Sequence, residues 1–78
     1  MISRDSDRPP YLQLAGLLEA EIRSGRLAPG ARVPSITTLV QTYGVAKNTA
    51  RRALGVLAER GLVTVIQGWG TFVKQPEE

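Results

Sequence analysis

Two helical patterns meet at a glycine in the stretch TTLVQTYGVAKNTARRALGVLAERG, residues 37–61. The first pattern ends at Gly44, which readily adopts the left-handed backbone that closes a helix. The second runs from about 46 to 60 before Gly61, and its apolar residues gather on one side at helical spacing. Two helices joined by a short turn containing glycine predict a helix-turn-helix. The apolar positions are Leu39, Val40 and Tyr43, then Ala50, Ala53, Leu54 and Leu57.

The flanking residues extend this pattern on both sides. Upstream, an apolar stripe predicts a helix that begins near Pro10 and stops near Gly25. Ser35 is a good N-cap for the helix that follows it. Downstream, residues 62–66 and 71–73 are rich in β-branched and aromatic residues, and a glycine turn separates them. The predicted fold is therefore α+β and mainly α: a three-helix winged helix-turn-helix with a C-terminal β-hairpin wing.

The length of 78 residues allows one domain. We expect residues 10–74 to form it. Residues 1–9 are expected to be a flexible N-terminal arm, and residues 75–78 a tail or the start of a linker.

The composition excludes several classes of site. The chain has no cysteine and no histidine, so it has no disulfide and no thiolate or imidazole that could act as a metal ligand or nucleophile. No acid–base pair suggests catalysis, and we expect neither an enzyme nor a cofactor. No apolar run approaches the roughly 20 residues that span a bilayer. The expected location is the cytoplasm, with no membrane partner.

The formal net charge of +3 is unevenly distributed. Residues 1–22 carry a net charge of −2, whereas residues 23–74 carry +7 with Glu59 as their one acidic residue. No acidic residue lies between Glu21 and Glu59. A segment of one sign and this length favours a polyanionic partner over an ordinary solvated surface.

The polar side of the predicted third helix concentrates that charge. Lys47, Asn48, Arg51 and Arg52 lie opposite the apolar side, with Lys47 and Arg51 one turn apart. Guanidinium, ammonium and amide groups are the donors that bind guanine, adenine and phosphate. The alternative is an unoccupied solvated face. The preceding turn and the following hairpin favour DNA binding.

Five short motifs give the chain a family resemblance: PGARVPS, YGV, TARRAL, ERGLV and QGWGTFV. Residues 10–73 resemble the winged helix-turn-helix domain of the GntR family of bacterial transcription regulators. The resemblance implies sequence-specific binding to double-stranded DNA by a regulator, most often a repressor. It places a recognition helix, about 46–60, in the major groove and a wing, 63–74, beside it.

The same resemblance implies further partners. Family members are usually dimers on inverted-repeat operators, and they pair through a C-terminal domain that binds a small-molecule effector. This sequence does not include that domain, so we expect either a fragment of a longer regulator or a stand-alone member. Self-association and effector binding would belong to the missing domain.

Individual positions can be carried over from the family. Lys47, Thr49 and Arg51 match positions that meet bases and phosphates, and Gln67 and Gly68 match wing positions near the minor groove. The family's Pro-Ser-Glu-Arg start of the second helix is replaced by residues 34–37, which read PSIT. The resemblance therefore places Ser35 and Thr37 at a phosphate contact, with a hydroxyl instead of the usual arginine.

Other departures weaken the pattern locally. Lys47 stands where the family usually has arginine, and so it loses a bidentate fork. Thr38 replaces the glutamate of a capping box, and Ala46 replaces a serine or threonine cap. Gly55 costs helix stability relative to alanine.

Trp69 lies between two glycines at the wing tip, where the family often has a basic residue. Its indole could lie along a sugar-phosphate wall and donate one hydrogen bond, or it could fold back over Val65 or Phe72. An exposed tryptophan also fits a rival function, a winged helix that serves as a protein–protein interaction module without sequence-specific DNA binding. The basic charge of residues 23–74 argues against that rival.

Overall fold

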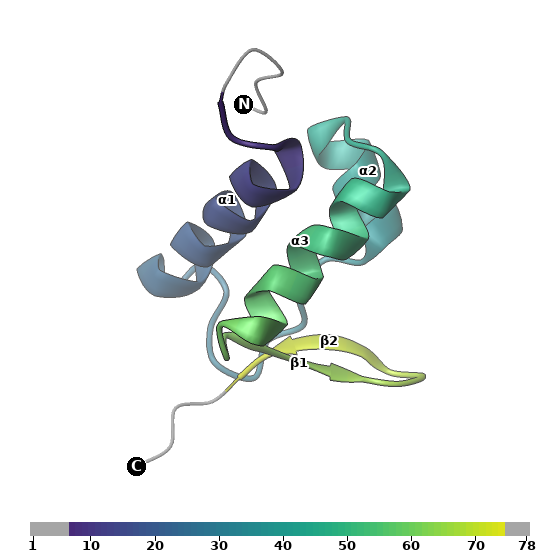
Figure 1. Cartoon of the computed structure of the whole chain (residues 1–78). Coiled ribbons are helices and arrows are strands. Elements are labelled where there is room, and N and C mark those ends of the chain that lie inside the picture. Colours follow the sequence, from purple (N-terminus) through teal and green to yellow (C-terminus); the bar gives the residue numbers. More distant parts are fainter. Residues whose placement is uncertain (1–6, 75–78) are drawn as a thin grey trace.

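Three helices precede a two-stranded hairpin in the computed structural model, which describes residues 7–74 (Figure 1). Residues 1–6 and 75–78, which include most of the predicted arm and the whole predicted tail, lie outside the described residues. The predicted fold class is confirmed. The elements are α1 (Pro10–Ser24), α2 (Ile36–Tyr43), α3 (Lys47–Glu59), β1 (Val63–Ile66) and β2 (Gly70–Val73).

The first two helices end where the sequence predicts. The chain leaves α1 at Gly25 with φ of 89° and leaves α2 at Gly44 with φ of 66°. Both angles lie in the left-handed region, which glycine adopts without a steric penalty. At the start of α2 the Ser35 hydroxyl accepts a hydrogen bond from the Thr38 N–H at 3.2 Å, as expected for an N-cap. Ala46, at the start of α3, provides no side-chain cap.

The end of α3 explains why β1 begins at Val63 and not at residue 62. The Leu62 N–H donates to the Leu57 carbonyl, and the Gly61 N–H donates to the Ala58 carbonyl, both at 3.0 Å. These two bonds are the Schellman pattern, with Gly61 at φ of 74°. Leu62 therefore belongs to the helix cap.

The hairpin is antiparallel, with Val63 opposite Val73 and Ile66 opposite Gly70. The Trp69 N–H donates to the Ile66 carbonyl at 2.9 Å, which closes a tight turn at the tip. This turn lets β2 begin at Gly70, one residue earlier than predicted. The extended segment before α2 joins the outer side of β2, where the Val33 N–H donates to the Thr71 carbonyl at 2.7 Å.

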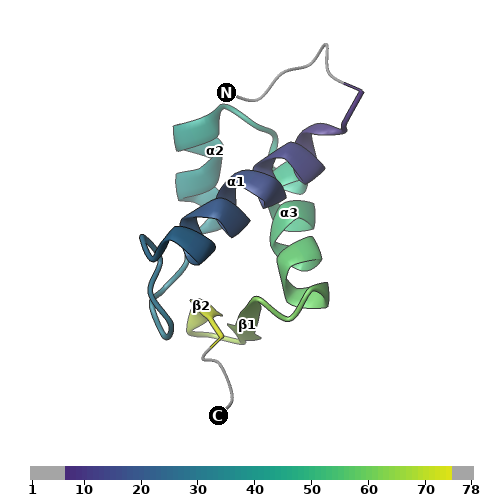
Figure 2. The ribbon, with the colours of Figure 1, turned by 90° about the vertical axis from the view of Figure 1, so that its left-hand side faces the viewer.

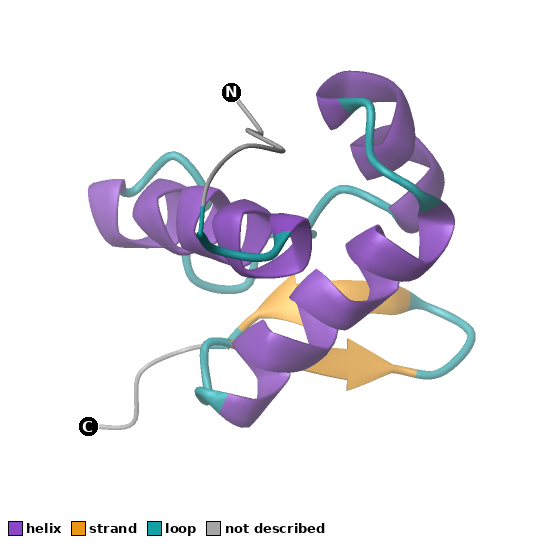
Figure 3. Cartoon of the chain, turned by 45° about the horizontal axis from the view of Figure 1, so that its top comes forward, coloured by secondary structure: helices purple, strands orange, loops and turns teal. Residues whose placement is uncertain are grey.

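The core lies between the three helices and the base of the hairpin. Helix α3 packs against α1, α2 and β1 (Figures 1 and 2). Strand β2 in turn pairs with β1. Figure 3 shows α3 passing across the hairpin, whose tip extends away from the helices. No helix within residues 7–74 is long and apolar enough to cross a bilayer. The buried core residues are Leu14, Ala15, Leu18, Val33, Leu39, Val45, Ala50, Ala53, Leu54, Leu57, Val63 and Val73.

Candidate nucleic-acid interface

The outward face of α3 carries the predicted base-reading residues. Lys47, Asn48 and Arg51 are exposed, and Thr49 is half-buried. The opposite side is closed by small residues, since Ala50 and Ala53 are fully buried. Within residues 7–74, no carboxylate forms an ion pair with Lys47 or Arg51. The face therefore presents unneutralised cations on a helix that is firmly seated in the core.

Arg52, the fifth predicted residue on α3, has a partner that the sequence pattern did not indicate. Its Cζ lies 4.0 Å from the centre of the Tyr11 ring, which belongs to the first turn of α1. This is a cation–π contact. Arg52 remains exposed, so it is held at the flank of the α3 face nearest α1.

Three arginines near α1 are paired with carboxylates. Glu19 of α1 binds both Arg23 and Arg60, each at 2.8 Å, and Glu21 lies 3.8 Å from Arg26. The hydrogen bonds from Arg23 and then Arg60 lower the pKa of the Glu19 carboxyl below its usual range. Arg23, Arg26 and Arg60 are thus paired with carboxylates of α1, whereas Lys47 and Arg51 on the outward face of α3 have no such partner among residues 7–74.

The start of α2 lies beside the wing. The Ser35 hydroxyl donates to the Thr38 Oγ1 at 3.0 Å while it accepts from the Thr38 N–H. Thr38 therefore takes part in the cap that a glutamate would otherwise complete. Thr37 is exposed at the same helix end. A groove of about 320 Å³ joins this end to α3 and β2, and its lining includes Ser35, Thr37, Leu54, Gly70 and Thr71.

Arg32 also lines that groove. It forms a β-bridge with Phe72, and its guanidinium lies across Gly70. A Cβ at position 70 would come within 2.9 Å of the Arg32 Nε. The sequence did show an extended segment there, but pairing with β2 depends on contacts between residues about forty apart.

The wing tip is apolar and exposed. Gln67, Gly68 and Trp69 form the exposed turn, and Trp69 is 73% exposed. Val65 is 61% exposed, so the indole does not fold back to shield it. The fold-back alternative over Val65 is therefore not observed. From Gly61 to Val73 the chain has no charged residue, which separates the wing chemically from α3.

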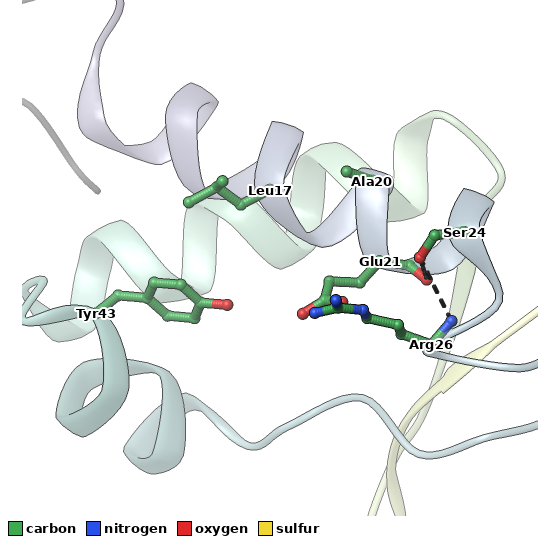
Figure 4. A pocket seen from close by; sticks show the side chains of 6 residues that line it. All are labelled: Leu17, Ala20, Glu21, Ser24, Arg26 and Tyr43. Atoms are coloured by element: carbon green, nitrogen blue, oxygen red, sulfur yellow. Dashed lines mark hydrogen bonds and ion pairs between the residues drawn. The ribbon is translucent and has the colours of Figure 1, made fainter.

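A second groove, of about 430 Å³, lies between α1 and α2 (Figure 4). Leu17, Ala20 and Tyr43 line it, and Glu21 faces Arg26 at one end. The Glu21 carboxylate in this groove is therefore already opposed by a guanidinium. Within residues 7–74 no group of acidic side chains could hold a metal ion.

The sequence of the three helices and the hairpin matches a known protein family. Residues 10–73 match the family described as bacterial regulatory proteins, gntR family. The chain belongs to the GntR family. This match covers the three helices and the hairpin and includes all ten residues proposed for the site.

Several GntR-type regulators are similar in sequence. The chain is 34% identical over 76 residues to the HTH-type transcriptional repressor NagR of Bacillus subtilis, covering 97% of this chain and 31% of NagR. It is 43% identical over 77 residues to the HTH-type transcriptional regulator Rv0792c of Mycobacterium tuberculosis, covering 99% of this chain and 28% of Rv0792c. The chain thus spans less than a third of the length of these relatives.

Solved structures share the fold. The structure of AraR(DBD) in complex with operator ORR3 matches with a TM-score of 0.83 and 33% identity, over 94% of this chain and 88% of that one. YtrA from Sulfolobus acidocaldarius, a GntR-family transcription factor, matches with a TM-score of 0.89 and 31% identity, over 99% of this chain and 81% of that one.

Proposed function

We propose that this chain binds double-stranded DNA sequence-specifically, as the DNA-binding domain of a bacterial transcription regulator that acts as a repressor. The observation that carries the proposal is the exposed face of α3, where Lys47, Asn48 and Arg51 stand without a carboxylate partner among residues 7–74. Such a helix fits the major groove, where its donors meet base edges. The likeness to NagR, named a repressor, and to AraR(DBD) bound to an operator supports it.

The wing completes the interface in this proposal. Gln67, Gly68 and Trp69 lie beside the duplex next to the groove that α3 enters. Arg52, Ser35 and Thr37 contact the backbone on either side of it, and Thr49 lies at the foot of the base-reading face. Phosphate contacts of this kind fix register, whereas the α3 contacts supply specificity.

The remaining partners follow from the size of the domain. A single module buries roughly 600–1,000 Å² of protein surface on DNA, which limits its affinity. We propose that pairing on an inverted-repeat operator comes from a domain outside this chain, which would also hold any small-molecule effector. Because its DNA target is the bacterial chromosome, we place the protein in the cytoplasm.

Selection from random duplexes tests the proposal directly. The chain is fused to a two-fold dimerisation domain, and bound DNA is sequenced after several rounds. We expect an inverted repeat whose half-site spacing is fixed, because both α3 helices must reach the major groove. The matched control is the same fusion with Lys47→Ala and Arg51→Ala, which should enrich no motif. Equal enrichment by both fusions would refute the proposal.

A protein-interaction module is the second candidate, and the exposed Trp69, Val65 and Ile66 favour it. It predicts that binding to any duplex is weak and nearly independent of salt. DNA binding through phosphates instead gives a steep salt dependence. A salt titration on one duplex therefore separates the two candidates.

A further inference from the structure

Arg52 is the one cation on α3 that is held by an aromatic ring. Its Cζ lies 4.0 Å from the Tyr11 ring centre, while Lys47 and Arg51 of the same helix have no ring contact within residues 7–74. Asn48 and Arg52 are four residues apart and so form a second row beside Lys47 and Arg51. This second row runs along the α1 side of the exposed face.

A ring restrains a guanidinium differently from a carboxylate. A carboxylate neutralises the charge and occupies the N–H donors at the guanidinium edge, as Glu19 does for Arg23 and Arg60. An aromatic ring covers only the flat face, so the five N–H donors, which lie in the guanidinium plane, remain free. The Tyr11 contact therefore limits the motion of Arg52 and leaves its charge and its donors available to another partner.

The position of the Arg52–Tyr11 contact indicates which part of the DNA Arg52 would bind. Residues at the centre of the α3 face point into the groove, toward base edges. Arg52 is drawn away from that centre toward α1, to the flank where a helix in the major groove meets the sugar-phosphate backbone. A charged, donor-rich group at this flank suits a phosphate oxygen.

We propose that Tyr11 is a positioning residue that orients the Arg52 guanidinium toward a DNA phosphate at the rim of the major groove. This inference rests on the proposed function, because it needs α3 to lie in that groove. The ordering of a long side chain before binding reduces the entropy lost on association. Tyr11 thereby strengthens DNA binding without touching the DNA.

Variants of Tyr11 and Arg52 test the pair. Tyr11→Phe keeps the ring, and we expect its affinity to stay within about twofold of the unmodified chain. Tyr11→Leu keeps apolar bulk without a π-face, and we expect it to weaken binding about three- to tenfold, on specific and random duplexes alike. Arg52→Gln should weaken binding by a similar or larger factor and reduce the salt slope by about one unit.

The double variant separates positioning from packing. If Tyr11 acts through Arg52, Tyr11→Leu causes no additional loss of affinity in the Arg52→Gln background. An equal loss in both backgrounds would show that Tyr11 acts through the packing of α1, and would overturn the proposal. Melting temperatures of all variants are measured, and each affinity is taken where that variant is fully folded.

A spectroscopic measurement covers the case in which Tyr11→Leu does not fold. The ring should shift the NMR signals of the Arg52 δ-methylene upfield in the unmodified chain and in Tyr11→Phe, and the Arg52 Nε–H signal should change when DNA is added. An unchanged affinity and salt slope for Arg52→Gln would overturn the inference. Loss of binding in Arg51→Ala in that same experiment would leave the proposed function intact.

Discussion

The outward face of α3 and the hairpin wing are neighbours with opposite chemistry. The α3 face carries Lys47 and Arg51 without a carboxylate partner in the described chain, whereas residues 61–73 contain no charged side chain. The wing instead exposes Val65, Ile66 and Trp69. Charged contacts to DNA release counterions and weaken with salt, but apolar contacts do not. The two surfaces should therefore contribute to binding in ways that salt can separate.

The largest effect should come from the centre of the α3 face. Arg51→Ala should cost about 1–3 kcal/mol of binding free energy and relax the preference at one base position. Fluorescence anisotropy on specific and random duplexes measures both quantities. Arg23→Ala, which removes the same charge from the Glu19 pair on α1, is the control and should change affinity little. Equal losses on the two duplexes would remove Arg51 from base reading.

Substituting one glycine in the wing and one in α3 should change the stability of the fold in opposite directions. Gly70 has φ of 126° and lies against the Arg32 guanidinium, so Gly70→Ala should lower the free energy of unfolding by about 1–3 kcal/mol. Gly55 lies on the exposed side of α3 with open space around it, and Gly55→Ala should raise that free energy by up to about 1 kcal/mol. Urea denaturation compares the two. An unchanged free energy of unfolding for Gly70→Ala would mean that the wing backbone shifts to accommodate the added methyl group.

Trp69 tests the apolar half of the comparison. Trp69→Ala should weaken binding by roughly 1 kcal/mol, about fivefold, because an indole loses contact with the duplex. The slope of log affinity against log salt should stay unchanged, since no charge is removed. Trp69→Phe, measured in parallel, should recover part of the loss. An altered slope would show that the wing tip acts through the charged contacts.

Lys47 tests the charged half. The unmodified chain should have a salt slope of about −4 to −5, corresponding to about four to six phosphate contacts. Lys47→Gln should make this slope shallower by about one unit and weaken binding a few-fold at low salt. DNA-binding titrations of both proteins from low to physiological salt measure the slope and the affinity. The same slope in both proteins would place Lys47 away from phosphates.

The smallest effect concerns acid. Because Arg23 and Arg60 lower the pKa of Glu19 in the folded chain, the unfolded chain binds the proton more tightly. The resulting stabilisation is present above the ordinary pKa of 4.5 and is lost as pH falls through the lower folded value. Thermal melts between pH 7 and pH 3 should show less of this acid sensitivity in Glu19→Gln. Identical pH profiles would show that the pairs contribute nothing measurable.

Local signals made most of the fold predictable. Gly25, Gly44 and Gly61 marked the helix ends because each supplies the left-handed angle that the chain needs there. The α3 face was also predictable, since helical spacing alone separates Ala50 and Ala53 from Lys47 and Arg51.

Contacts between distant residues were not predictable in the same way. Tyr11 fitted the apolar stripe of α1, and nothing local indicated that Arg52 would stack on it. The exposure of Trp69 was undecided because a turn sequence does not determine where a large side chain lies. The bond from Leu62 to Leu57 shortened β1 for a related reason, since strand propensity does not include helix capping.

The two contacts between α1 and α3 have a mechanical consequence. Tyr11 and Glu19 are eight residues apart on α1. Their partners are also eight apart, since Arg52 lies on α3 and Arg60 caps its C-terminus. The two helices therefore run in the same general direction from N- to C-terminus. The two contacts that join them lie about 12 Å apart along the helix axis. One contact alone would let the helices rotate about it, whereas two contacts also resist rotation and sliding of α1 relative to α3. A rotation of α1 relative to α3 would therefore strain at least one of these two contacts.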